Sequence, residues 1–384
     1  WHLGHTTWFF ETFVLKRARP SYLGINSAYE YLFNSYYNAV GPMHCRDRRG
    51  LISRPTVAEV FDYRRAIDER MIESLTDHDD RHFHEVAPIV WLGLHHEQQH
   101  QELLLTDIKH VFAQNPLYPV YQERARDKAA GDSALEWIHF AGGLGWIGHH
   151  DNGFAFDKEF AFDNESPRHQ RFLQPFLLAS RPVTNGEYLK FIEDGGYEQP
   201  LIWLSDGWRQ VKENGWIAPL YWNKDDGRWR SFTLAGMREI EPAEPVCHVS
   251  YFEADAYARW SGARLPDEAE WEVAAAELPV RGNFVESERL HPAPLGNTAT
   301  KDELHQVFGD VWEWTRSAYS PYPGYRASGD ALGEYNGKFM CNQYVLRGGS
   351  CATSRSHMRP AYRNFFAPDK RWQFSGIRLA KDCL

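Results

Sequence analysis

The spacing of apolar residues divides the chain into a helical first third and a remainder built of shorter elements. Four segments carry apolar side chains near the three- and four-residue intervals of an amphipathic helix, and they are residues 1–18, 28–40, 55–75 and 84–113. Thr56 followed by Glu59 predicts a capping box at the start of the third segment. Four helices joined by short connections predict an up-and-down bundle over residues 1–125.

Beyond the bundle the character of the sequence changes. Residues 126–134 are charged and lack apolar periodicity, so we interpret them as a linker. From residue 135 onward Gly, Pro, Trp and Tyr are frequent, and only residues 252–261 and 267–277 have a helical pattern. The rest predicts short strands and long ordered loops. The expected fold class is therefore α+β in two domains, a bundle over 1–125 and a second domain over 135–384.

Composition narrows the classes of function. The chain has 384 residues and a net charge of −10, which argues against a nucleic-acid-binding protein, because phosphates call for a basic face. No apolar run is long enough for a transmembrane helix. Five cysteines without a CxxC pair argue against a disulfide framework or a structural zinc site and favour a reducing, cytoplasmic location. The chain begins with Trp1 rather than Met, so we expect further residues upstream.

The candidate chemistry lies in histidines. His96 and His100 stand four residues apart in HHEQQH, which places two imidazoles on one face of a helix, as in many metal sites. His5 lies in an apolar N-terminal segment, where a buried imidazole needs a partner or a metal ion. Three imidazoles would suit iron(II), zinc or copper, and ligand type alone does not choose among them. The alternative is a polar helix face with solvated histidines.

Three strings in the first third resemble one family. WHLGHTTWFFE, YEYLFNSYYNAVGP and HHEQQHQELLLTD are similar to the DinB-type bundle of the sulfoxide synthases of ergothioneine biosynthesis. The resemblance implies a non-haem iron(II) ion held by His5, His96 and His100. On this interpretation His2 and His95 lie on other faces of their helices.

The second domain resembles the formylglycine-generating (sulfatase-modifying) fold, a variant of the C-type lectin fold. The resemblance depends on the order of several strings, which are RPVTN, RLPDEAEW, GDVWEWT, RGGS and FSGIR. Most of their residues are expected to be structural. Formylglycine-generating oxidases carry two copper-binding cysteines shortly after RGGS, where this chain has Thr353 and Met358, so copper chemistry is not expected. Cys351 is expected to be a packed thiol.

The family resemblance implies a reaction and a set of substrate contacts. The reaction uses O₂ to join the sulfur of cysteine or γ-glutamylcysteine to imidazole C2 of hercynine, giving a sulfoxide. Tyr36 and Tyr37 are the candidate proton donors, or rings that only pack. Gln99 is the candidate for binding hercynine, or for orienting a ligand histidine. The candidates for the carboxylate of the thiol are arginines, which otherwise serve in surface or structural pairing: Arg46, Arg355, Arg359 and Arg363.

Three other functions stay open at this point. Selenoneine synthase shares the architecture and would use a selenosugar as donor. A DinB-like thiol transferase or hydrolase would use zinc and consume no O₂. A non-catalytic, lectin-like module would bind a ligand without any reaction. The expected partners in each case are small molecules, with neither nucleic acid nor membrane among them.

Overall fold

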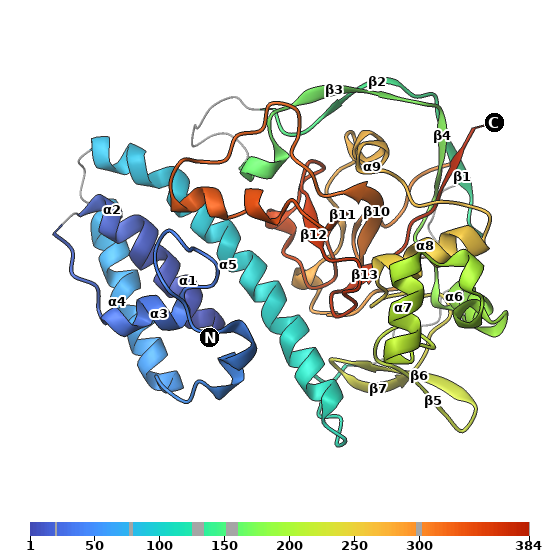
Figure 1. Ribbon diagram of the computed structural model, residues 1–384, viewed down its shortest axis with the longest axis horizontal. Coiled ribbons are helices and arrows are strands. Elements are labelled where there is room, and N and C mark those ends of the chain that lie inside the picture. The colour runs from blue at the N-terminus through green and yellow to red at the C-terminus, as the bar shows by residue number, and fades with distance from the viewer. Residues whose placement is uncertain (20, 77–79, 125–133, 151–159, 297–301, 384) are drawn as a thin grey trace. The chain divides into compact units, whose positions relative to one another are not determined.

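The computed structural model describes residues 1–19, 21–76, 80–124, 134–150, 160–296 and 302–383. It divides into two compact units (Figure 1). The first unit comprises residues 1–104, 152–163 and 325–338, and the second comprises residues 105–151, 164–324 and 339–384. The long helix α5 contributes residues to both units. The first unit therefore contains a short segment from late in the chain beside the N-terminal helices. The predicted linker, residues 126–134, lies outside the described residues except for its last position.

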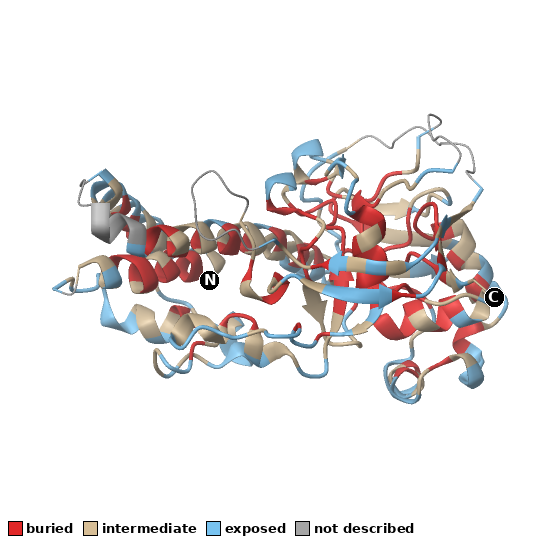
Figure 2. Ribbon diagram, turned by 90° about the horizontal axis from the view of Figure 1, so that it is seen from above, coloured by how far each residue is buried: buried red, intermediate tan, exposed pale blue. Residues whose placement is uncertain are grey.

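The first unit is helical, as the apolar periodicity predicted. Its helices are α1 (His2–Phe10), continued by a π-helical turn (Glu11–Leu15) and α2 (Lys16–Ala18), then α3 (Ser27–Phe33), α4 (Val57–Thr76) and α5 (Asp80–Gln114). Aromatic rings fill the space between them, since Trp8, Phe9, Phe33 and Tyr37 are all buried. Figure 2 shows buried positions in red along the ribbon. Glu11 is also buried, and its carboxylate accepts hydrogen bonds from the hydroxyls of Tyr22 and Tyr63.

The second predicted helix was too long. The periodicity suggested residues 28–40, but α3 ends at Phe33. The next residue, Asn34, is buried and binds the backbone of Tyr37 in both directions: its Oδ1 accepts from the Tyr37 amide and its Nδ2 donates to the Tyr37 carbonyl. An asparagine that bonds locally to backbone competes with the helix. Tyr36 and Tyr37 therefore lie in a turn after the helix.

The capping box at the start of α4 is confirmed. The Thr56 amide donates to a Glu59 carboxylate oxygen at 2.7 Å, and the Glu59 amide donates to the Thr56 hydroxyl at 3.3 Å. We expect Thr56→Ala to lower the free energy of unfolding by about 1 kcal/mol, because the helix start loses its side-chain cap. Urea denaturation measures this loss. Thr76→Ala, at the other end of α4, should change it by less than about 0.5 kcal/mol.

The second unit consists of small sheets and short helices. One sheet has the order β1 (Trp137–Phe140), β4 (Phe176–Ala179), β14 (Ala380–Asp382), and another the order β12 (Asn364–Phe366), β11 (Tyr344–Arg347), β10 (Trp312–Ala318), β13 (Ser375–Gly376). The smaller sheets are β2 (Gly143–Ile147) with β3 (His169–Leu173), β5 (Trp222–Asp225) with β6 (Arg228–Thr233) and β7 (Gly236–Glu239), and β8 (Gly282–Asn283) with β9 (Phe308–Gly309). All pairs are antiparallel except β10 with β13 and β8 with β9. The observed architecture confirms the α+β class.

The helices of the second unit include the two that the sequence predicted and two that it missed. Those predicted are α8 (Tyr251–Trp260) and α9 (Glu268–Ala275), each opened by a capping box. Those missed are α6 (Asn185–Glu193) and α7 (Ser205–Asn214). A capping box between Thr184 and Glu187 starts α6, so its signal was present in the string TNGE.

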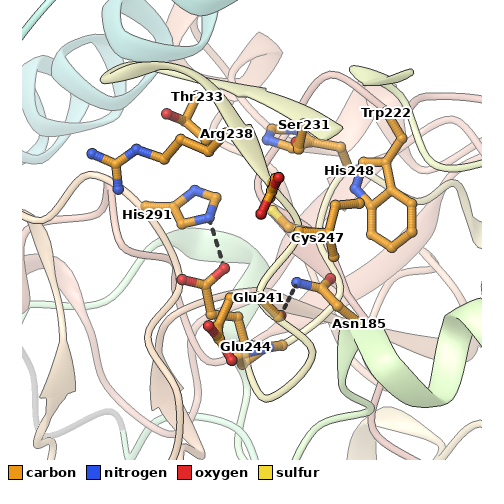
Figure 3. Close-up of a pocket in the computed structure, with 13 residues that line it drawn as sticks. Asn185, Trp222, Ser231, Thr233, Arg238, Glu241, Glu244, Cys247, His248 and His291 are labelled. Carbon is orange, nitrogen blue, oxygen red and sulfur yellow. Dashed lines mark hydrogen bonds and ion pairs between the residues drawn. The ribbon is translucent and has the colours of Figure 1, made fainter. Parts of the chain in front are cut away.

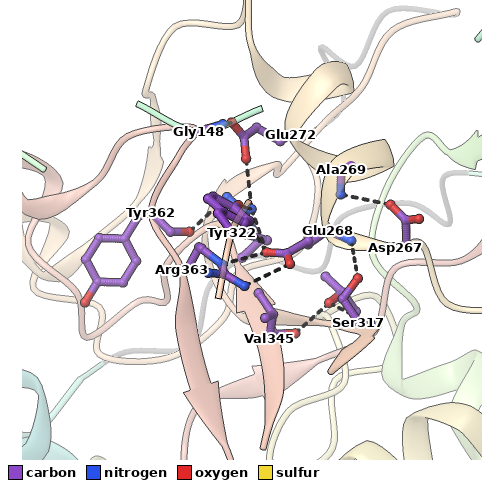
Figure 4. A network of polar contacts seen from close by, with 12 residues as sticks. Gly148, Asp267, Glu268, Ala269, Glu272, Ser317, Tyr322, Val345, Tyr362 and Arg363 are labelled. Atoms are coloured by element: carbon purple, nitrogen blue, oxygen red, sulfur yellow. Dashed lines mark hydrogen bonds and ion pairs between the residues drawn. The ribbon is translucent and has the colours of Figure 1, made fainter. Parts of the chain in front are cut away.

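The strings that carry the family resemblance are largely structural, as expected. Several of them pair through buried ion pairs. Glu268 of RLPDEAEW contacts Arg347 of RGGS, in the network that Figure 4 shows around Glu268. Glu313 of GDVWEWT contacts Arg378 of FSGIR. Cys351 is fully buried in an apolar cluster. Among the described residues, no helix is long and apolar enough to cross a membrane.

Candidate metal centre

Three buried histidines converge in the first unit. His5 comes from α1, and His96 and His100 come from successive turns of α5. One nitrogen atom of each ring lies within 4.8 Å of one nitrogen of the other two. The ring centroids are 4.6–4.9 Å apart, and the Nε2 atoms of His5 and His96 are separated by 3.2 Å. The predicted grouping of these three side chains is therefore present in the structure.

Two glycines allow the helices to approach closely enough for this grouping. A Cβ atom at Gly4 of α1 would collide with the Phe33 ring of α3. A Cβ atom at Gly93 of α5 would lie 2.6 Å from the Phe10 ring of α1. Both positions need the small residue because rings occupy the space of a side chain. The second contact brings the turn before His96 against α1.

The contacts behind the rings fix which nitrogen atoms face the shared centre. Nδ1 of His5 lies 2.6 Å from the carbonyl oxygen of Phe33, to which it donates, so Nε2 carries the lone pair. Nδ1 of His96 is buried and has no hydrogen-bond partner among the described residues. Two Nε2 atoms directed at each other at 3.2 Å are poorly matched without a proton or a cation between them. This donor set fits a metal ion.

The electrostatic environment keeps the imidazoles neutral. Burial lowers the pKa of His96 to about 3. Burial, followed by the charge of His96, lowers the pKa values of His5 and His100 well below the ordinary range. Metal ligation requires deprotonated imidazole, so at neutral pH the three side chains are in the form that binds a cation.

Gln99 and Tyr36 both lie near Tyr335, whose ring lies near that of His96. The hydroxyls of Tyr36 and Tyr37 are 3.4 Å apart, and Tyr37 packs against Phe13 with ring centroids 4.7 Å apart. Gln99 accepts a short hydrogen bond from the hydroxyl of Tyr335. The Tyr335 ring is 5.6 Å from that of His96 and 6.3 Å from that of Tyr36.

Tyr335 is a candidate functional residue that the sequence patterns did not indicate. It belongs to residues 325–338, the late segment of the chain that joins the first unit. The segment is tied to the turn after α3, because the Glu334 carboxylate accepts from the backbone amides of Asn38 and Ala39. No local pattern in the sequence indicates that a residue so far along the chain from His100 stands beside the histidines.

Arg49, which the sequence analysis did not propose, lies near the histidines. Arg49 and Arg46 both belong to the 3₁₀ helix Arg46–Leu51, in which Arg46 is exposed and Arg49 is half-buried. The Arg49 guanidinium lies 3.6 Å above the ring of Trp1, and that ring stacks on His5 at 4.6 Å. Arg49 also donates to the Ser35 hydroxyl at 3.2 Å. Its charge contributes to the lowered pKa values of His5 and His100.

The arginines after RGGS lie in the second unit, where two of them have buried carboxylate partners. The Arg359 guanidinium pairs with Glu165, and that of Arg363 pairs with Glu268 at 2.8 Å. Arg355 is exposed, and its backbone amide donates to Glu286. For Arg359 and Arg363 this arrangement favours the structural alternative that the sequence left open.

A recess in the second unit holds another group of polar side chains (Figure 3). It measures about 40 Å³, room for a few water molecules. His291 pairs with Glu244 at 3.2 Å, and Asn185 donates to the Glu241 carbonyl at 2.9 Å. His248 also lines the recess, and its Nε2 lies 2.6 Å from the buried Lys109 amine. Among the described residues, the His5, His96 and His100 cluster alone groups three side chains as closely as a metal requires.

Comparison with known proteins identifies the family of the second part of the chain. The sulfatase-modifying factor enzyme 1-like domain matches residues 128–383, which is about two thirds of the sequence. The chain belongs to this family. It is 30% identical over 276 residues to the formylglycine-generating enzyme of Streptomyces coelicolor, a match that covers 60% of this chain and 85% of that protein. The resemblance that RPVTN, RLPDEAEW and RGGS predicted is confirmed.

Within the sulfatase-modifying factor family, relatives named hercynine oxygenase are among the most similar proteins. The protein from Mycolicibacterium smegmatis is 39% identical over 258 residues, 59% of this chain and 58% of that protein. The protein from Mycobacterium tuberculosis is 40% identical over 248 residues, 59% of this chain and 57% of that protein. The chain thus spans a little over half the length of these relatives. The predicted likeness to the sulfoxide synthases of ergothioneine biosynthesis is confirmed as a relationship.

Proposed function

We propose that the chain is an iron(II)- and O₂-dependent sulfoxide synthase acting on hercynine. The observation that supports this most is the convergence of three buried, neutral imidazoles in a chain related to hercynine oxygenases. The reaction joins the sulfur of a thiol to imidazole C2 of hercynine and adds one oxygen atom to that sulfur. The hydrogens lost from sulfur and carbon leave with the second oxygen atom as water, so the balance closes with O₂ alone.

His5, His96 and His100 would hold the iron. When bound, iron(II) supplies the redox centre that O₂ chemistry requires. The chain's own contribution is to position the ligands and to limit water. The Phe33 carbonyl orients His5, and the closeness of α1 and α5 at Gly93 sets the ring spacing. All three imidazoles are at most 8% exposed, so the centre is largely shielded from bulk water.

The tyrosines are the proposed proton donors. Burial raises the pKa values of Tyr36 and Tyr37 well above the ordinary range, so both phenols keep their protons at neutral pH. A phenol that is protonated can donate a hydrogen bond or a proton to a reacting oxygen atom. Tyr335 holds the amide of Gln99 in one orientation, and Gln99 is the proposed contact of the hercynine carboxylate or imidazole.

We propose Arg49, in preference to Arg46, as the residue that binds the carboxylate of the thiol. Arg49→Ala is expected to raise the KM for the thiol by about 10- to 100-fold, the loss of one charged hydrogen-bonding partner. Steady-state kinetics with cysteine and with γ-glutamylcysteine measure the change. The exposed neighbour Arg48 serves as control, since Arg48→Ala removes an equal charge from the same 3₁₀ helix. A larger effect of Arg46→Ala than of Arg49→Ala would contradict this assignment.

Loading the protein with iron(II) under anaerobic conditions, and then measuring O₂ uptake with hercynine and each donor, tests the proposed function. We expect uptake with a thiol donor, in proportion to the sulfoxide formed. Uptake with a selenosugar alone would identify selenoneine synthase. Thiol transfer or hydrolysis with bound zinc and no O₂ uptake would identify the zinc enzyme. Ligand binding without any turnover would favour the lectin-like module.

A further inference from the structure

His2 contacts the proposed metal ligand His100 directly. Nδ1 of His2 lies 2.8 Å from Nδ1 of His100, and the two ring centroids are 5.1 Å apart. His2 opens α1, three residues before His5, so both side chains lie on the same face of that helix. The interpretation from sequence placed His2 on another face and gave it no role.

The contact determines which nitrogen of His100 is available to a metal ion. Nδ1 and Nε2 lie on different sides of an imidazole ring, and Nδ1 of His100 is hydrogen-bonded to His2. Nε2 is then the nitrogen directed at the shared centre, as it is in His5, whose Nδ1 donates to the Phe33 carbonyl. Two of the three histidines therefore have their Nδ1 atoms hydrogen-bonded on the side away from the shared centre. The partner is a carbonyl oxygen for His5 and an imidazole for His100.

We infer that His2 is a positioning residue of the metal centre, which accepts the Nδ1–H of His100 and fixes the orientation of that ring. This inference rests on the proposed metal site. A cation on Nε2 makes the opposite N–H a better donor, so an acceptor behind the ring strengthens ligation. In most metal sites a carbonyl or a carboxylate fills this role, and here it falls to a second imidazole. α1 therefore supplies one ligand and the support of another.

Two substitutions of His2 separate the acceptor role from packing. His2→Asn places an amide oxygen close to the position of Nδ1, so it keeps an acceptor for His100. His2→Leu keeps apolar bulk and removes the acceptor. His95→Leu is the matched control, because His95 also neighbours a ligand in sequence but stacks on the Phe160 ring, with centroids 4.0 Å apart.

The measurement is the dissociation constant for iron(II), determined anaerobically by competition with a chelator, together with the thermal midpoint of the metal-free protein. We expect His2→Leu to weaken binding by about 10- to 100-fold and His2→Asn by less than about 3-fold, with thermal midpoints close to that of the parent. His95→Leu should bind as the parent does.

Three results would overturn the inference. Parent-like binding by His2→Leu would remove the role of His2 and leave the proposed function intact. Equal weakening by His2→Leu and His2→Asn, with one nitrogen fewer in the iron X-ray absorption spectrum of both, would make His2 a ligand itself. A parent protein that binds no iron(II) would end the proposed function as well as this inference.

Discussion

His96→Ala is expected to weaken iron(II) binding by at least about 1,000-fold and to abolish hercynine-dependent O₂ uptake, because one of the three proposed ligands is lost. The His96 ring is 4.9 Å from that of His5 and 4.6 Å from that of His100. Its removal leaves two imidazoles and a cavity that water can enter. Metal content after anaerobic loading and desalting measures the loss of iron(II) binding. An oxygen electrode measures the loss of O₂ uptake.

The control for this substitution lies on the same helix. His110 is exposed on α5, beyond His100 toward the end of the helix. Its Nδ1 lies 3.1 Å from the Tyr221 hydroxyl in the second unit. His110→Ala should retain a full equivalent of iron. If His96→Ala retained a full equivalent with unchanged affinity, the three histidines would not form the metal site.

Glu268→Ala is expected to lower the free energy of unfolding by about 3–5 kcal/mol, because it leaves buried guanidinium charges without their carboxylate. The Glu268 carboxylate accepts from Arg347 at 3.0 Å and from Arg363 at 2.8 and 3.0 Å (Figure 4). All three side chains are buried. Without the carboxylate, Arg347 keeps its ion pair with Glu272 at 2.9 Å, and Arg363 loses the Glu268 carboxylate. Urea denaturation followed by tryptophan fluorescence measures the loss.

The effect of Glu268→Ala depends on pH in a defined direction. Burial raises the pKa of Glu268, but the charges of Arg363 and Arg347 outweigh it and leave the pKa below its unfolded value of 4.5. The carboxylate therefore stabilises the fold above about pH 4.5 and loses that contribution as the pH falls further. The difference between parent and variant should shrink on acidification.

Glu286→Ala is the control for Glu268→Ala. Glu286 is exposed and accepts from the Ser354 hydroxyl and the Arg355 amide, so its removal should cost less than about 1 kcal/mol. Equal losses for the two variants would contradict the structural role assigned to Glu268 and, with it, to Arg363.

The parts of the fold that depend on local signals could be predicted from the sequence. The capping box of Thr56 and Glu59 marks the start of α4, and apolar periodicity marks α1, α4 and α5. The end of α3 could not be predicted from periodicity, because a single asparagine side chain decides it. The start of α6 carries the same capping-box signal in Thr184 and Glu187, but the neighbouring glycine and proline residues favour a loop.

The candidate metal centre could be predicted only as far as the family resemblance reaches. His96 and His100 share one helix, so their spacing alone suggests a common face. His5 joins them through tertiary packing, which the resemblance implied and the apolar segment around it only supported. Arg49 and Tyr335 lie near the histidines because of chain folding between distant residues, and no motif marks either.

Iron X-ray absorption on the anaerobically loaded protein shows directly whether His5, His96 and His100 hold the metal ion. We expect three imidazole nitrogen ligands at about 2.1 Å and no sulfur from the protein. The same spectrum of a His5→Ala variant should show fewer imidazoles or no bound iron at all. A coordination shell containing a protein thiolate, or a His5→Ala spectrum identical to that of the parent, would show that these three histidines are not the metal ligands.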